Sequence, residues 1–237
     1  WLEAQGYQVS VARKFQEGES IQSPTHTRQG MDQIGWPAAE DAAKGFGAAI
    51  LQGFSNRIHP LALFNQLAEI NHSECVFASN TSSLSIARIA ENVQRPERVI
   101  GMHFFNPATI MKLVEIVNTN FTNRQTTETI IELTKQMGKT PVLCKDSPGF
   151  IVNRVARPYY IESLRLAEEG VAEFAQIDLL MEATGFKMGP IRLMDLIGND
   201  VNYAVSCSVY EQMNNPERLK PSYIQDEKVR EVKLGKN

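Results

Sequence analysis

Residues 142–153 read Val142-Leu143-Cys144-Lys145-Asp146-Ser147-Pro148-Gly149-Phe150-Ile151-Val152-Asn153, and the pattern of the chain changes inside this stretch. Its apolar start is typical of a short buried strand. The residues that follow predict a long helix, with Ser147 as its N-cap and Pro148 in its first position. We therefore expect a domain boundary near residue 146.

On the N-terminal side of this boundary, short apolar runs alternate with helical periods. We expect strands at residues 6–12, 76–78, 99–105, 113–117 and 142–144, and helices at 60–70 and 125–137, the second ending at Gly138. No convincing further strand is seen between Val11 and Ile50. This alternation predicts an α/β domain over residues 1–145, with its sheet covered on both faces.

On the C-terminal side, the chain has helical periods and few strand signals. Helices are expected at residues 148–169, 176–184, 190–197 and 200–213, and Gly170 ends the first of them. This pattern predicts an all-α domain over residues 146–237.

The composition excludes several classes of protein. With 43% hydrophobic and 22% charged residues, the chain is an ordinary globular mixture, and no apolar run approaches a membrane span. A net charge of -3 provides no basic surface for nucleic acid. The three cysteines are far apart, so we expect no disulfide framework, no metal site and a reducing, cytoplasmic setting. Because the chain begins at Trp1 without Met and stops abruptly at Asn237, we expect both ends to be incomplete.

His103 and Glu115 are the first candidates for chemistry, because each is a polar residue inside an apolar run. A lone histidine there is at least as often a satisfied core residue. However, a turn at Asn106-Pro107 would bring the strand with Glu115 back beside the strand with His103. The carboxylate would then fix the imidazole tautomer and stabilise its charged form, as a general base requires.

A polar turn, Ser79-Asn80-Thr81-Ser82-Ser83, follows the expected strand at 76–78. Ligands bind at the carboxyl ends of strands in open α/β sheets, so the turn is a candidate binding site. Taken alone, the turn is more often the N-cap of a helix, here one that begins at Leu84. Asn153 lies one turn into the expected long helix and points either at a ligand or at solvent.

These residues lie in motifs that resemble the 3-hydroxyacyl-CoA dehydrogenase family from about residue 64 onward. The motifs are Ser79-Asn80-Thr81-Ser82-Ser83-Leu84, Gly101-Met102-His103-Phe104-Phe105-Asn106-Pro107, Met111-Lys112-Leu113-Val114-Glu115, residues 145–154, Met188-Gly189-Pro190 and Asp195-Leu196-Ile197-Gly198. The resemblance implies an incomplete Rossmann-type NAD-binding domain followed by a helical substrate and dimerisation domain. It also implies a homodimer that oxidises the 3-hydroxyl of an acyl-CoA with NAD in fatty-acid β-oxidation or related catabolism.

The resemblance also implies roles for individual residues. His103 would be the general base, and Glu115 would orient it. Ser82 and Asn153 would hydrogen-bond the substrate oxygen. Asn80, Ser82, Asn106 and Asn56 would lie near the cofactor.

The chain departs from the family pattern near the cofactor. The Gly-rich phosphate loop and its strand are not found, and Arg13 stands where the family has an acidic residue on the adenosine ribose. Arg13 would suit the 2′-phosphate of NADP, although a divergent region explains it more simply. Asn56 and Leu61 stand where the family has an acidic residue and a lysine.

Two functions therefore compete. The first is an NAD-dependent dehydrogenase, with an NADP-preferring enzyme as its variant. The second is a non-catalytic CoA-binding or structural dimer with a degraded cofactor site. The sequence does not indicate the acyl chain length of the substrate. Residues 200–205 look more like the corresponding stretch of bacterial members of the family, including those of aromatic-compound catabolism.

Overall fold

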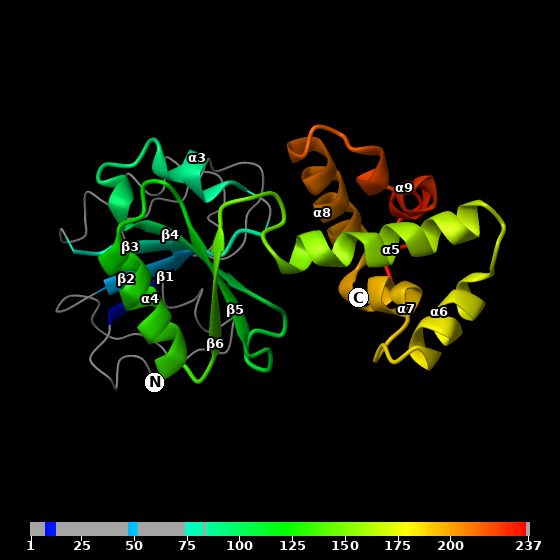
Figure 1. Ribbon diagram of the computed structural model, residues 1–237, viewed down its shortest axis with the longest axis horizontal. Helices are drawn as coiled ribbons and strands as arrows, with labels where there is room; N and C mark the ends of the chain where they lie inside the picture. The colour runs from blue at the N-terminus through cyan, green and yellow to red at the C-terminus, as the bar shows by residue number, and fades with distance from the viewer. Residues whose placement is uncertain (1–7, 13–46, 52–73, 83, 236–237) are drawn as a thin grey trace. The chain divides into compact units, whose positions relative to one another are not determined.

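The computed structural model describes residues 8–12, 47–51, 74–82 and 84–235 of the chain (Figure 1). The chain divides into two compact units, Trp1–Ser147 and Pro148–Asn237. The first unit holds the strands, and the second consists of helices.

The described part of the first unit forms a mixed sheet with strand order β1-β2-β3-β4-β5-β6. The strands are β1 (Gln8–Ala12), β2 (Gly47–Leu51), β3 (Val76–Ser79), β4 (Val99–Phe104), β5 (Leu113–Asn118) and β6 (Thr140–Lys145). Strands β1 to β4 are parallel, β5 runs antiparallel to β4, and β6 is parallel to β5. The predicted α/β fold is confirmed, and β2 is a strand that the sequence did not delimit.

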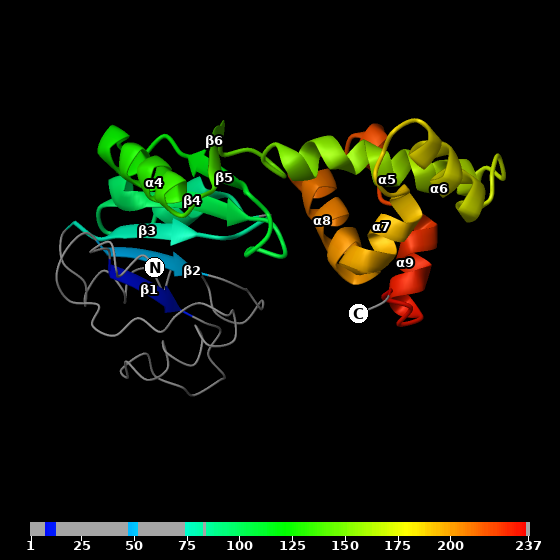
Figure 2. The same ribbon diagram turned by 90° about the horizontal axis from the view of Figure 1, so that it is seen from below.

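One face of this sheet packs against α4 (Arg124–Gln136), as Figures 1 and 2 show. Asn123 caps the helix through a bond from the Thr126 amide, and Gly138 follows its end with a φ of 71°. The apolar face of α4 buries Ile130 and Leu133 against the strands. Their buried partners are Val76, Ala78, Ile100, Met102, Val114 and Ile116.

The opposite face of the sheet carries a shorter helix, α3 (Ile86–Ala90). Successive strand residues point to opposite faces, so Gly101 and His103 lie on the side away from Ile100 and Met102. A Cβ on Gly101 would stand 2.6 Å from the Val117 Cβ and 3.0 Å from the Ile86 Cγ1. Only glycine therefore allows α3 to approach β4 this closely, and the sheet is covered on both faces as expected.

The second unit is helical throughout its described length. Its helices are α5 (Val152–Glu168), α6 (Phe174–Ala183), α7 (Pro190–Ile197), α8 (Asn199–Gln212) and α9 (Tyr223–Arg230), with a 3-10 turn, η3 (Glu217–Leu219). The sequence predicted α7 with its observed bounds but missed α9, because α9 has no long apolar stripe. Among the described residues, no helix has the length and apolar character needed to cross a membrane.

The predicted start of the long helix is wrong. Helix α5 begins at Val152, so Ser147 is not its N-cap and Pro148 is not its first residue. The reason is that Gly149 and Phe150 have φ values of 71° and 48°, in the left-handed region that a right-handed helix excludes. A Cβ on Gly149 would also lie 2.9 Å from the Val209 Cγ2, so this turn packs tightly against α8.

A buried arginine joins α5 to α8 inside this unit. The Arg157 Nη1 donates to the Asn202 carbonyl oxygen at 3.0 Å and to the Ser206 hydroxyl at 2.9 Å. Its Nε donates to the Asn153 carbonyl oxygen at 3.0 Å, and the guanidinium lies 4.9 Å from the Tyr160 ring centroid. Arg157 therefore fixes the first turns of α5 against α8.

Candidate active site

His103 and Glu115 face each other across the antiparallel strands β4 and β5. The His103 Nδ1 lies 2.7 Å from the Glu115 Oε2, and the two residues are 6% and 0% exposed. The turn after β4 brings the chain back, as the sequence indicated. The predicted pairing of these side chains is confirmed, while their catalytic roles stay predictions.

This hydrogen bond decides which nitrogen of His103 is basic. A carboxylate only accepts hydrogen bonds, so Nδ1 donates this one and the basic lone pair lies on Nε2. A buried carboxylate without such a partner would be strongly disfavoured. The pair can therefore take up a proton at Nε2 and stabilise the resulting imidazolium through Glu115.

The ring of Phe105 packs edge-on against His103, with 4.7 Å between ring centroids and an interplanar angle of 61°. Phe105 is half-buried. The sequence did not single it out, because an aromatic residue after a strand is more often part of the core. Its contact shields the imidazole from water and strengthens the electrostatic interaction with Glu115.

Asn80 joins the ends of two parallel strands. Its side-chain Oδ1 accepts a bond of 2.8 Å from the amide of Phe104, the residue after His103. The bond ties the carboxyl end of β3 to the carboxyl end of β4. Asn80 was predicted as a cofactor contact, and this bond gives it a part in holding His103 in place as well.

The polar turn after β3 leads into the short helix α3, and its side chains make different contacts. Thr81 accepts from the Leu84 amide at 3.0 Å, and Ser85 is the N-cap of α3, accepting from the Arg88 amide at 3.3 Å. The predicted N-cap within residues 79–83 is therefore wrong, because α3 begins only at Ile86 and its N-cap, Ser85, lies beyond that turn. Ser82 is half-buried and takes no part in these capping bonds, which leaves its predicted ligand role open.

Asp146 also holds this turn, although sequence reasoning gave it no function there. Its Oδ2 accepts from the Ser85 hydroxyl at 2.7 Å and from the Ala87 amide at 2.8 Å. A carboxylate at a helix N-terminus is stabilising. Because Asp146 is 61 residues from Ser85, no local sequence signal could have revealed the contact.

The remaining predicted site residues, Asn106, Asn153 and Asn56, lie on different parts of the chain. Asn106 is exposed directly after β4, at the same edge of the sheet as Asn80 and Ser82. Asn153 is half-buried in the first turn of α5, in the second unit. Asn56, and the departures at Arg13 and Leu61, lie outside the described residues. Within the described ranges, no group of three or more His, Cys, Asp and Glu side chains is placed to hold a metal.

Polar groups thus gather at the carboxyl ends of parallel strands β3 and β4, where open α/β sheets bind nucleotide cofactors. The fold and this edge define a Rossmann-like dinucleotide-binding unit. Residues 58–147 match the family model of the 3-hydroxyacyl-CoA dehydrogenase NAD-binding domain, and residues 149–237 match that of the 3-hydroxyacyl-CoA dehydrogenase C-terminal domain. The chain belongs to the 3-hydroxyacyl-CoA dehydrogenase family.

Individual relatives agree with this assignment. The chain is 47% identical over 202 residues to the 3-hydroxyadipyl-CoA dehydrogenase of Escherichia coli K12, covering 84% of this chain and 42% of that protein. The structure of 3-hydroxybutyryl-CoA dehydrogenase from Escherichia coli K12 aligns with a TM-score of 0.80 at 39% identity, covering 95% of this chain and 52% of that one. The (S)-3-hydroxybutyryl-CoA dehydrogenase of Ralstonia eutropha aligns with a TM-score of 0.76 at 35% identity, covering 80% and 67%. The chain thus spans about half the length of the first two relatives.

Proposed function

We propose that this chain is part of an enzyme that oxidises (S)-3-hydroxyacyl-CoA to 3-ketoacyl-CoA with NAD. The observation that carries the proposal is the buried pair of His103 and Glu115, joined by a bond of 2.7 Å at the ligand-binding edge of the sheet. A core histidine needs only a hydrogen-bond partner. A buried carboxylate directly opposite provides more, because it stabilises the charged imidazole that proton abstraction produces.

In this reaction His103 takes the proton of the substrate hydroxyl on its Nε2. Glu115 holds the imidazole in the required tautomer and offsets its positive charge. Phe105 covers the ring against water. A positioned acid–base group of this kind contributes on the order of 10²- to 10⁴-fold in rate.

NAD fits the described edge of the sheet. Asn80 and Ser82 are half-buried there and Asn106 is exposed, and their amide and hydroxyl groups suit the carboxamide and ribose of the nicotinamide end. When bound, NAD supplies the carbon that accepts the substrate hydride. The three side chains would orient that end of the cofactor beside His103.

Ser82 and Asn153 are the proposed partners of the substrate oxygen. Both are half-buried polar residues, and Asn153 has its backbone held by Arg157. Hydrogen-bond donors aimed at an oxygen whose charge changes during the reaction stabilise the transition state. We assign cofactor binding to residues 1–145 and substrate binding to residues 146–237, as the sequence predicted.

We also propose that the protein forms a homodimer through its helical unit. Large apolar side chains of this unit are exposed in the single chain, which supports a covering partner. They include Leu179, Leu180, Phe186, Leu196 and Val201. The three cysteines, all of them in the described part of the chain, are thiols, which is consistent with the reducing, cytoplasmic setting expected from the sequence.

The experiment that tests the proposed function follows NADH oxidation with acetoacetyl-CoA, which runs the reaction in reverse. The protein at its full length is compared with His103→Asn, whose side-chain amide can take the place of Nδ1, donate to Glu115 and keep the buried carboxylate satisfied. We expect turnover by the wild type and its loss in the variant. Equal rates in the two proteins would refute the role of His103, and CoA binding without any turnover would favour a non-catalytic relative.

A further inference from the structure

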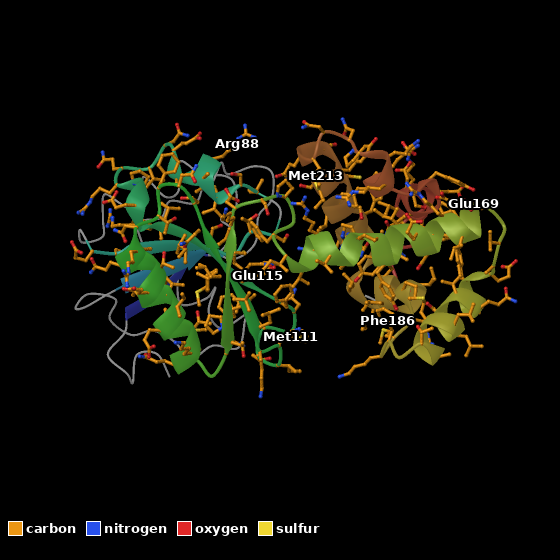
Figure 3. All side chains as sticks on the ribbon, viewed as in Figure 1. Arg88, Met111, Glu115, Glu169, Phe186 and Met213 are labelled. Carbon is orange, nitrogen blue, oxygen red and sulfur yellow. The ribbon has the colours of Figure 1, made fainter. Side chains whose placement is uncertain are left out.

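The loop between β4 and β5 is held by a lysine from another part of the sheet unit. The Lys139 Nζ donates to the Ala108 carbonyl oxygen at 2.5 Å and to the Met111 carbonyl oxygen at 2.9 Å. Lys139 lies between the end of α4 and the start of β6, and its side chain is half-buried. Figure 3 labels Met111 on this loop and Glu115 on the strand that the loop enters.

Further contacts join the same two segments. The Thr140 amide donates to the Lys112 carbonyl oxygen at 2.8 Å, directly beside the lysine bonds. The Lys139 ammonium also lies 6.0 Å from the centroid of the Phe104 ring, within the range of a cation–π contact. Lys139 thus contacts the last residue of β4, Phe104, the middle of the loop at Ala108 and its end at Met111.

The loop has its own turn, which the lysine supports from outside. The amides of Ile110 and Met111 both donate to the Pro107 carbonyl oxygen at 3.0 Å. The salt bridges found among the described residues do not include Lys139. Its charge is therefore directed at backbone oxygens of this loop, where charge-assisted hydrogen bonds are stronger than neutral ones.

The loop matters because of what it joins. It leaves β4 after Phe104, one residue beyond His103, and enters β5 at Leu113, two residues before Glu115. It also carries Asn106, and Phe105 at its start packs on the imidazole of His103. A shift of this loop would move Phe105, which packs on His103, and Asn106, which follows it.

We propose that Lys139 is a positioning residue, which fixes the β4–β5 loop and thereby sets Phe105 and Asn106 beside His103. The inference rests on the proposed function of His103 as the base. Lys139 acts through backbone carbonyls and touches neither substrate nor cofactor. A misplacement of about 1 Å at an active site can lower turnover by about a hundredfold, so loss of the lysine should be visible in the kinetics.

The test compares Lys139→Met, Lys139→Gln and Lys139→Arg in the full-length protein, with Lys135→Met as the control. Lys135 is an exposed lysine in the last turn of α4, four residues before Lys139. Three quantities are measured: amide hydrogen exchange at Ile110 and Met111, the NMR signals of the His103 imidazole, and kcat and KM with an acyl-CoA substrate. The thermal midpoint separates these effects from loss of folding.

In Lys139→Met we expect faster exchange of both loop amides, shifted His103 signals and a kcat lowered by about ten- to a hundredfold. Lys139→Gln, which keeps one donor group, should be intermediate and serves if the Met variant does not fold. Lys139→Arg should recover most of the loss, and Lys135→Met should match the wild type.

Unchanged loop exchange or unchanged His103 signals in Lys139→Met would overturn the inference. A lowered thermal midpoint with normal kcat and KM would also overturn it, because Lys139 would then only stabilise the fold. A wild type without turnover refutes the proposed function instead. In that case the exchange rates and the His103 signals still decide whether Lys139 positions the loop.

Discussion

Each unit of the molecule buries a charged side chain, and the two charges are satisfied in different ways. In the sheet, Glu115 is fully buried and meets the imidazole of His103, a group that can change its own charge. In the helical unit, Arg157 is 3% exposed and bonds to the carbonyl oxygens of Asn153 and Asn202 and to the Ser206 hydroxyl. These oxygens are fixed dipoles that do not titrate.

This difference between the partners of Glu115 and Arg157 distinguishes a side chain proposed to act in chemistry from one that stabilises the structure. Burial lowers the pKa of the Arg157 guanidinium to about 10, so it stays charged at neutral pH and its bonds hold α5 against α8. The carboxylate of Glu115, in contrast, faces a side chain that can take up and release a proton. A buried charge indicates catalysis when its partner titrates, and indicates architecture when its partners are backbone and hydroxyl oxygens.

The largest effect is expected from His103→Asn, which removes the imidazole but keeps a donor for Glu115 at the position of Nδ1. Turnover should fall by about 10²- to 10⁴-fold while the thermal midpoint changes little. Steady-state kinetics and calorimetry on the same preparations measure both. A variant that loses its fold together with its activity would place His103 in the same structural class as Arg157.

Glu115→Gln should have a smaller effect. The amide oxygen can still accept from Nδ1, but the charge that stabilises the imidazolium is gone. A charge-assisted hydrogen bond contributes about 1.5–3 kcal/mol, which corresponds to a loss of roughly ten- to a hundredfold in kcat. Normal kcat in this variant would mean that the carboxylate satisfies the histidine without assisting it.

Arg157→Met should act on stability rather than on turnover. Loss of its bonds to α8 should lower the free energy of unfolding by about 1–3 kcal/mol, measured by urea titration. Turnover per folded molecule should fall far less than in the His103 variant, because Arg157 bonds only the backbone carbonyl oxygen of Asn153. The exposed Arg218→Met is the matched control, and a collapse of turnover in a stably folded Arg157→Met would abolish the distinction between the two charges.

The smallest effect concerns Cys144, in the strand beside β5. Burial raises the pKa of its thiol to about 12, and the charges of Glu115 and Asp146 add to that shift. Glu115→Gln removes one of these charges, so the thiolate fraction rises and alkylation by iodoacetamide at about pH 9 should become roughly two- to fivefold faster. An unchanged rate would show that Glu115 carries no charge near the thiol.

Much of the sheet unit could be predicted from the sequence because its signals are local. The apolar runs at 76–78, 99–105 and 113–117 gave β3, β4 and β5 to within a residue or two. A polar residue in each of two runs, separated by a turn, was enough to predict the pair of His103 and Glu115. Each inference used residues fewer than twenty positions apart.

The contacts that hold the site together could not be predicted in this way. The bond from Lys139 to Ala108 joins residues 31 positions apart, and the bond from the Phe104 amide to Asn80 joins residues 24 apart. In the sequence, Lys139 and Asn80 are polar residues near the end of a helix or strand, and nothing in their neighbourhood indicates these distant partners. The start of α5 was misjudged because the left-handed conformation of Phe150 has no sequence signal.

The reversal of β5 relative to β4 has a consequence for folding. His103 and Glu115 are only 12 positions apart, so a single short turn brings them together. Bringing together residues so close in sequence costs little loop-closure entropy. The parallel neighbours β3 and β4 meet only through a crossover, which is slower. The bond between His103 and Glu115 is thus a short-range contact, which can form before the parallel strands of the sheet have found their register.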